Sequence, residues 1–184
     1  MKVNKRFYKT IIFLFLFFIL SIPAYILFSK IKANTESEVS GCFQREEKIV
    51  QGDSMEPMLS NGKKIVLLKN YYQCDNLVNP GDIISYNYAG NANPLIKIIK
   101  VTDQDKVEIV DNKLKVNGEI LKNSGAEEYI FNEKEIRMLS LYVKNENIPK
   151  DSFLIFGDNI NDSTDSRKFG AVSAVDFLGK FIFE

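Results

Sequence analysis

A serine in a compact turn is the first feature of the sequence that suggests catalysis. Residues 52–59 read Gly-Asp-Ser-Met-Glu-Pro-Met-Leu, and a small residue before the serine with a proline after it predicts a tight turn. Such a turn presents the Ser54 hydroxyl and leaves its own backbone N–H unpaired, as an oxyanion donor. Ordinary surface turns have similar compositions, so this segment alone favours a structural turn over a nucleophile.

A lysine in an apolar strand is the candidate base. Residues 94–101 read Pro-Leu-Ile-Lys-Ile-Ile-Lys-Val, so a strand here has apolar residues on both faces around Lys97. Burial disfavours an ammonium and lowers its pKa, and a neutral lysine accepts a proton from a serine. The pattern alone also fits, and favours, a lysine whose stem packs while its ammonium reaches solvent.

The third segment, residues 157–170, is dense in Asp, Asn and Ser. Calcium is a poor fit, because three positions counted from Asp158 lack the side chains that an EF-hand loop needs: Ile160, Ser163 and Phe169. The segment instead predicts a hydrogen-bonded loop in which Arg167 pairs with Asp165 or with Asp158.

The composition restricts the chemistry further. Because the chain contains no histidine, Ser-His-Asp and Cys-His hydrolases are excluded. Zinc sites mostly use histidine, and the 2 cysteines are the only soft ligands left, so neither a metal nor another cofactor is expected. Lys+Arg and Asp+Glu are both 24, and this balance gives no reason to expect a nucleic acid partner.

A membrane anchor is predicted at the N-terminus. Residues 1–9 are basic without an acid, and residues 10–28 contain no charge. A helix of this length rises about 28 Å, roughly one hydrocarbon core. A cleaved signal peptide is the alternative, but the apolar run is longer than such signals use, and bulky Ile31 lies three positions before a cut after Ala33.

The charges around the span predict its orientation. Under the positive-inside rule, residues 1–9 are cytoplasmic, residues 29–45 form a juxtamembrane linker, and residues 46–184 form an extracytoplasmic domain at the plasma membrane. Lipid is therefore an expected contact. Cys42 and Cys74 then lie where a disulfide persists, which permits a bridge without requiring one.

The extracytoplasmic part reads as many short strands separated by turn residues, which indicates a mostly-β domain. Asn117-Gly118 is a strong hairpin signal, and a short helix is expected around Glu133–Leu141. The predicted strands are Lys48–Gln51, Lys64–Lys69, Asp82–Tyr88, Leu95–Val101, Lys106–Val110, Leu114–Val116, Glu119–Leu121, Phe153–Phe156 and Phe177–Phe183.

These segments, in this order, resemble bacterial type I signal peptidases. Residues 52–59 match the pattern G-x-S-M-x-P-T-L apart from Met58, and residues 157–170 match G-D-N-x-x-x-S-x-D-S-R-x-F-G position for position. Three further stretches are similar to R-G-D-I-V-x-F, Y-I-K-R-V-V-G-L-P-G-D-K-I-E-I and L-x-V-N-G-x: residues 79–86, 95–109 and 114–119. Aligning Asp105-Lys106 with the D-K of the second pattern places the family's catalytic lysine on Lys97.

The resemblance implies a mostly-β domain of coiled antiparallel sheets that works as a serine peptidase without a cofactor. Ser54 is the implied nucleophile and Lys97 the implied general base. The implied substrates are exported preproteins with signal peptides, cut after a small residue of an Ala-x-Ala site. The implied oxyanion or supporting residues are Ser54, Gly52, Asp53, Ser163, Asp158, Asp165 and Arg167. Among them, Ser163 orients the lysine and Asp165 pairs with Arg167, on a loop that also contains Gly157 and Asn159. The implied substrate-binding residues are Met55 and Pro57.

Some positions depart from the pattern. Gly52 stands where some members have a serine as second oxyanion donor, Ile98 replaces an arginine, and residues 102–104 replace a Leu-Pro-Gly run. LexA-like autopeptidases are an alternative family with the same dyad. They are cytosolic and carry a DNA-binding domain, whereas this sequence predicts a membrane span and contains no basic recognition helix, so this alternative is disfavoured. The alternatives that stay open are a dedicated peptidase, or a non-cleaving assembly factor, for a particular surface or pilus protein.

Overall fold

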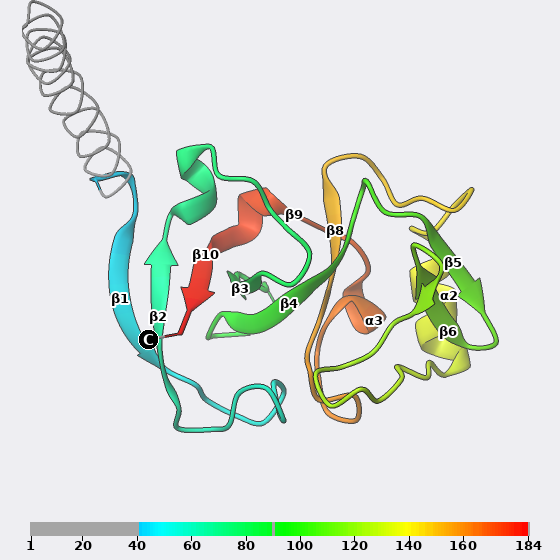
Figure 1. Cartoon of the computed structure of the whole chain (residues 1–184), viewed down its shortest axis with the longest axis horizontal. Helices are drawn as coiled ribbons and strands as arrows, with labels where there is room; N and C mark the ends of the chain where they lie inside the picture. The colour runs from blue at the N-terminus through cyan, green and yellow to red at the C-terminus, as the bar shows by residue number, and fades with distance from the viewer. Residues whose placement is uncertain (1–40, 90, 184) are drawn as a thin grey trace, which may run out of the picture. The chain divides into compact units, whose positions relative to one another are not determined.

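The computed structural model describes residues 41–89 and 91–183 (Figure 1). The predicted cytoplasmic segment, the predicted membrane span and most of the predicted linker lie outside these residues. Within the described ranges, no helix is both long and apolar enough to span a bilayer. Cys42 and Cys74, the only cysteines of the sequence, are both disulfide-bonded.

Two antiparallel sheets form the described domain, so the mostly-β prediction is confirmed (Figure 1). The larger sheet has the strand order β1-β2-β10-β3-β4-β8-β9 and the smaller one β5-β6-β7. Their bounds are β1 Gln44–Ile49, β2 Lys64–Lys69, β3 Ile83–Tyr86, β4 Leu95–Thr102, β5 Val107–Val110, β6 Lys113–Val116, β7 Glu119–Ile120, β8 Ser152–Phe156, β9 Val172–Ser173 and β10 Phe177–Ile182.

Most predicted elements are present. The hairpin turn Asn117-Gly118 joins β6 to β7, and both residues have positive φ, as a type I′ turn requires. The helix α2 (Glu133–Ser140) begins at a capping box made by Asn132 and Glu135. The first strand was misplaced: β1 is Gln44–Ile49 and pairs with β2, whereas the apolar residues had suggested Lys48–Gln51.

Four short elements have no signal in the sequence. They are the helix α3 (Ser166–Phe169), the strand β9, and the 3₁₀ turns η1 (Tyr71–Cys74) and η2 (Ala174–Asp176). Each is at most four residues long, which is too short for a hydrophobic period to show.

The larger sheet is buried on both faces near β4. Ile98 belongs to one apolar cluster with Met55, while Ile99 belongs to a second cluster with Phe153. A third cluster lies between the smaller sheet, α2 and β8. This two-sided burial explains the continuous apolar run in β4, and it removes Lys97 from water.

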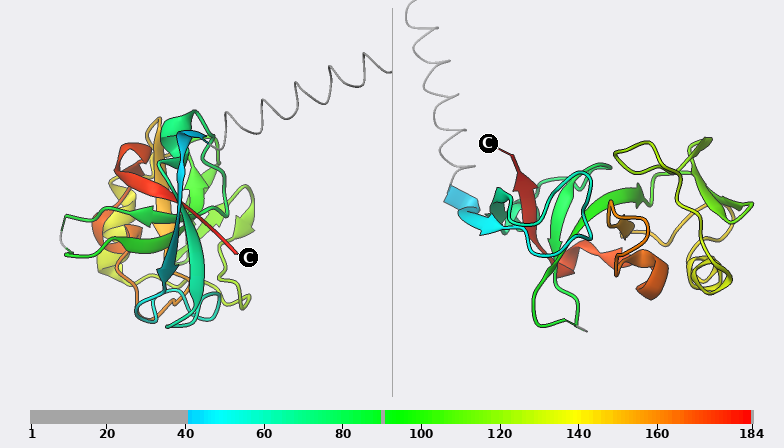
Figure 2. Two further views of the ribbon diagram at one scale, coloured as in Figure 1. Left: turned by 90° about the vertical axis from the view of Figure 1, so that its left-hand side faces the viewer. Right: turned by 90° about the horizontal axis from the view of Figure 1, so that it is seen from below.

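Two loops of the chain lie close to the strand β4. The loop of residues 50–63 follows β1, the loop of residues 157–165 follows β8, and β8 pairs directly with β4. Two perpendicular views place the first loop beside the second (Figures 1 and 2). The topology therefore gathers the three segments that carry the candidate chemistry.

Candidate active site

Ser54 lies in a turn that is held by its neighbours. The Glu56 N–H donates to the Asp53 carbonyl over 3.0 Å, which puts Ser54 and Met55 at the two central positions. Met55 is 1% exposed and packs in the apolar cluster with Ile98. Burying a side chain of this size stabilises the turn by about 2 kcal/mol, so the position of Ser54 is set by its neighbour.

Lys97 reaches this serine from β4. Its Nζ lies 3.0 Å from Ser54 Oγ and 2.7 Å from the Ile96 carbonyl, to which it donates. The Lys97 side chain is 1% exposed, so it does not extend its ammonium to solvent. The two candidate residues, 43 positions apart in the sequence, are therefore within hydrogen-bond distance.

The surroundings lower the pKa of Lys97. Burial lowers it from 10.5 to about 8; the Asp165 carboxylate opposes this, and the positive charges of Arg167 and Lys168 add to it. With this pKa, about a tenth of the lysine is neutral at pH 7 and about half at pH 8. A neutral amine beside a hydroxyl is the arrangement that a general base needs.

The loop after β8 fastens the backbone of the Ser54 turn. The Asn159 N–H donates to the Ser54 carbonyl, and the Asn159 side-chain amide donates to the Asp53 carbonyl, both over 3.1 Å. Asp158 accepts from the Met58 N–H over 3.1 Å. These three bonds connect segments about a hundred residues apart and fix the serine relative to β4.

The ion pair in this loop is Asp165–Arg167, not Asp158–Arg167. Both Asp165 oxygens accept from the guanidinium, over 2.9 and 2.8 Å, in a fork-like geometry. The pair is almost fully buried, with side chains 0% and 5% exposed. Asp165 also accepts from the Gly157 N–H over 3.0 Å. The pair thereby connects α3 to the residue that precedes Asp158.

Ser163 and Gly157 lie close to the nucleophile. The Ser163 hydroxyl is buried without a hydrogen-bond partner in the described part of the chain, so the bond to Lys97 that the resemblance implies is not formed in this structure. A Cβ on Gly157 would lie 2.1 Å from Ser163 Oγ and 2.4 Å from the Ser54 carbonyl oxygen. Only glycine fits at position 157.

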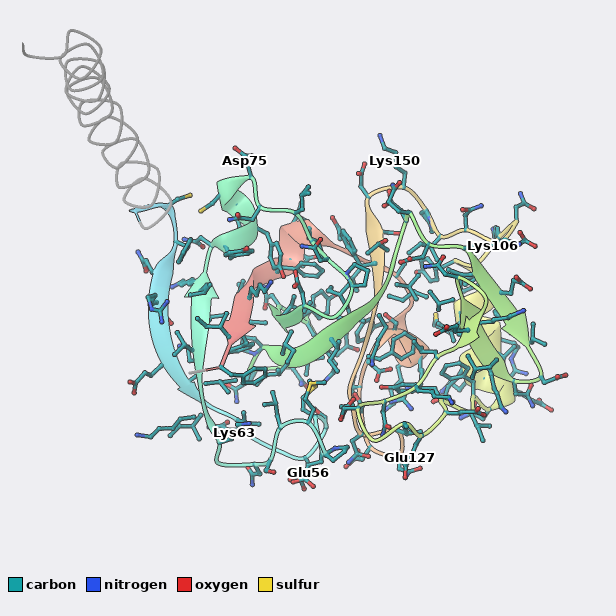
Figure 3. All side chains as sticks on the ribbon, in the orientation of Figure 1. Glu56, Lys63, Asp75, Lys106, Glu127 and Lys150 are labelled. Atoms are coloured by element: carbon teal, nitrogen blue, oxygen red, sulfur yellow. The ribbon has the colours of Figure 1, made fainter. Side chains whose placement is uncertain are left out.

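A second supporting loop, residues 122–128, had no signal in the sequence. Ser124 donates to Asp158 through both its N–H (2.9 Å) and its hydroxyl, and Asn123 donates to the Asp158 carbonyl over 3.2 Å. Figure 3 shows this loop, marked by Glu127, beside the turn marked by Glu56. The contact between Ser124 and Asp158 spans 34 positions, so local patterns do not reveal it.

Tyr129, which follows this loop, contacts both Gly157 and Arg167. The side chain is fully buried and its hydroxyl donates to the Gly157 carbonyl over 2.8 Å. Its ring lies against the Arg167 guanidinium, 5.8 Å from the centroid. Burial, followed by the nearby carboxylates, raises the pKa of this phenol, so the hydroxyl stays a donor at any ordinary pH.

A cavity of about 540 Å³ opens beside Ser54. Of the residues predicted to bind substrate, Met55 lines it, whereas Pro57 is exposed and is not among its lining residues in the described part of the chain. Gly52 also lines it, with φ of 80°, and donates its N–H to the Asn61 side chain over 3.2 Å. Its lining residues include the apolar Val50, Leu95 and Ile96. Uncharged polar residues line it as well: Gln51, Ser85, Asn91 and Asn93.

The comparisons with known proteins agree with this geometry. The sequence matches the model of the family "Signal peptidase, peptidase S26" over residues 6–184. It is 29% identical to a signal peptidase IB of Staphylococcus aureus over 144 residues, which are 73% of this chain and 74% of that protein. It is also 29% identical to a signal peptidase I P of Bacillus subtilis subsp. natto over 143 residues, which are 74% of this chain and 75% of that protein.

A solved structure was also found. It is a signal peptidase I from Enterococcus faecalis, with 23% sequence identity and a TM-score of 0.43, and the match covers 57% of this chain and 97% of that chain.

Proposed function

The chain belongs to the signal peptidase family, peptidase S26, and is a serine endopeptidase; we propose that it removes N-terminal signal peptides from exported preproteins, with Ser54 as nucleophile and Lys97 as general base. The observation that carries the assignment of roles is the 3.0 Å contact between Ser54 Oγ and Lys97 Nζ. The near-complete burial of Lys97 supports it, because burial supplies the neutral amine.

The first half of the reaction forms an acyl-enzyme. Neutral Lys97 takes the proton of the Ser54 hydroxyl as Oγ attacks the scissile carbonyl. The Ser54 N–H, to which no described residue offers an acceptor, is the donor placed for the oxyanion. The tetrahedral intermediate collapses with cleavage of the C–N bond, and the Lys97 ammonium gives its proton to the leaving amine.

The second half regenerates the enzyme. Water attacks the ester carbonyl after passing a proton to Lys97, which is again neutral, and the ester bond to Ser54 Oγ breaks. The proton returns to Oγ, and the signal peptide leaves with a new carboxylate. The hydrogen bonds of Asn159 and Asp158 hold the turn through both halves, because neither residue exchanges a proton in them.

The free edge of β4 suggests how the substrate is held. β8 pairs with β4 only from Ile98 onward, so residues 95–97 have no strand partner on that side within the described chain. An extended substrate that adds a strand there brings its carbonyl to Ser54 and its side chains to the cavity. The residue before the cut then meets the apolar wall near Ser54, which suits the small residues of an Ala-x-Ala site.

The proposal includes the membrane anchor and the plasma membrane location. An uncharged run at residues 10–28, behind a basic N-terminus, supports a single span with the catalytic domain outside the cytoplasm. A signal peptide has an apolar core of its own, which favours the bilayer. Anchoring enzyme and substrate in one membrane raises their effective concentration for each other.

The test is cleavage of a model preprotein with an Ala-x-Ala site by the full chain in detergent. Wild type and the control Ser60→Ala, an exposed serine near the same turn, should both cleave it, and Ser54→Ala should not. Cleavage by Ser54→Ala would disprove the nucleophile. Folded wild type that cleaves no such substrate would contradict the proposed function.

A further inference from the structure

The cavity beside Ser54 is lined by both apolar and charged residues. Apolar residues such as Met55 and Ile96 line it with Ser54, and three charged residues line it as well: Glu46, Lys48 and Lys69. These are the only charged side chains among its lining residues in the described part of the chain. They come from β1 and β2, at the side of the sheet away from β4 (Figure 1).

The strand register explains why these charges share one wall. Glu46 and Lys48 are two residues apart on β1, so both lie on the same face as buried Val50. On the adjacent strand β2, Lys69 lies on the face of Leu67, which is the Cα partner of Glu46. The charged residues Glu46, Lys48 and Lys69 therefore lie on the same face of the sheet as the apolar residues Val50 and Leu67.

The three groups form one cluster. The Glu46 carboxylate accepts from Lys48 over 2.7 Å and from Lys69 over 3.3 Å. Their side chains are 30%, 46% and 45% exposed, so a ligand in the cavity can reach them. Each ammonium has three N–H donors and Glu46 takes one from each, so the cluster keeps donors and a net charge of +1.

The position of the cluster relates it to the substrate. Glu46 precedes Val50 by four residues of extended chain, roughly 13 Å. Glu46, Val50 and Ser54 all line the cavity. An extended substrate that has its scissile bond at Ser54 and runs alongside β1 therefore needs at least about four residues to reach Glu46. Resting on the proposed function above, we propose that Lys48 and Lys69 select preproteins with an acidic side chain about four to six residues before the cleaved bond.

The expected preference is modest. Partly exposed ion pairs change an equilibrium by about two- to fivefold, and salt weakens them. We therefore expect a substrate with Glu in this window to have a kcat/KM about two- to fivefold above that of its Lys counterpart. The Gln counterpart should lie between them, because a neutral amide accepts the same hydrogen bonds without the charge.

The experiment compares three peptides that carry Glu, Gln or Lys five residues before an Ala-x-Ala site, each tested with the full chain in detergent. Cleavage is measured with wild type, and dissociation constants of the uncleaved peptides are measured with Ser54→Ala. A fourth peptide with Glu five residues after the site controls for total peptide charge. The dissociation constants show whether the enzyme prefers Glu even if no peptide is cleaved.

Variants identify the residues that are responsible. Lys69→Gln should remove most of the Glu preference, and Glu46→Gln should increase it, because an anion that competes with the substrate is lost. The matched control is Lys64→Gln, since Lys64 is an exposed residue of the same strand but points to the face opposite to that of Lys69. This control removes the same charge and should leave the preference unchanged.

The outcomes separate the two proposals. Equal kcat/KM and equal dissociation constants for the three peptides, or a preference for Lys, would overturn the acidic selection and leave the signal peptidase function intact. An equal loss of preference in Lys64→Gln and Lys69→Gln would also overturn it, since bulk charge would then be responsible. A Glu preference in dissociation constants without any cleavage by wild type would contradict the proposed function alone.

Discussion

Replacing Lys97 by methionine should stabilise the folded chain at neutral pH while abolishing its activity. Burial lowers the Lys97 pKa from 10.5 to about 8. One pKa unit corresponds to about 1.4 kcal/mol, so the protonated lysine costs the folded state about 3 kcal/mol. Methionine has a similar length and no charge. Its loss of the hydrogen bonds to Ser54 and Ile96 costs about 2 kcal/mol, which leaves a net gain of about 1 kcal/mol at pH 7.

The sign of this gain should reverse as the pH rises. Because the folded-state pKa of Lys97 lies below the unfolded one, the unfolded chain binds more protons between about pH 8 and 10.5, and wild-type stability increases there. By pH 10 about 2.5 kcal/mol of the cost has disappeared. Lys97→Met should then be less stable than wild type by about 1 kcal/mol, and the two stabilities should be equal near pH 9.

Urea unfolding of the full chain in detergent, followed by circular dichroism at several pH values, measures this difference. The control is Lys64→Met, which removes the same charge from an exposed position. Its stability relative to wild type should change little over the same pH range. If the two variants showed the same pH dependence, the lowered pKa of Lys97 and its physical cause would both be refuted.

Two further substitutions test the support of the site. Gly157→Ala should lower kcat/KM at least tenfold, because its Cβ would lie 2.4 Å from the Ser54 carbonyl oxygen and must displace the turn, whereas Gly125→Ala meets only ordinary contacts and should retain activity. Arg167→Ala should lower the free energy of unfolding by about 3–5 kcal/mol, since it leaves Asp165 buried without its partner.

The control for the second substitution is Arg137→Ala. Arg137 forms an exposed pair with Glu133 on α2, which contributes about 0.3–0.5 kcal/mol. Similar unfolding free energies for the Arg137 and Arg167 variants would contradict the structural role of the buried pair. Unchanged activity in Gly157→Ala would show that the Ser54 turn tolerates displacement.

The proximity of Ser54 and Lys97 was anticipated only through the family resemblance, because the pattern around each residue alone favoured an ordinary turn and a lysine that reaches solvent. The apolar run around Lys97 indicated its burial, although the side chain is buried more completely than the pattern suggested. The position of β1 could not be predicted from the sequence, because the strand consists mainly of exposed polar residues that show no hydrophobic alternation. Its pairing with β2 decides its position, and pairing is not a local property.

The second supporting loop could not be predicted for a related reason. Ser124 matters because it reaches Asp158 across 34 positions, and Tyr129 because its hydroxyl reaches Gly157. Neither residue belongs to a periodic segment. Between the two possible partners of Arg167, the residue pattern left the choice open, whereas the family resemblance implied Asp165. The structure pairs it with Asp165, which is also the N-cap of α3.

The central claim is that neutral Lys97 activates Ser54, and the pH dependence of kcat/KM tests it most directly, because that quantity reports the free enzyme. The pKa of about 8 predicts a rise of about tenfold between pH 7 and 9, with its midpoint near 8. Lys97→Met should show no activity at any of these pH values. A flat profile across this range, or a Lys97→Met variant that cleaves with the wild-type profile, would contradict the claim.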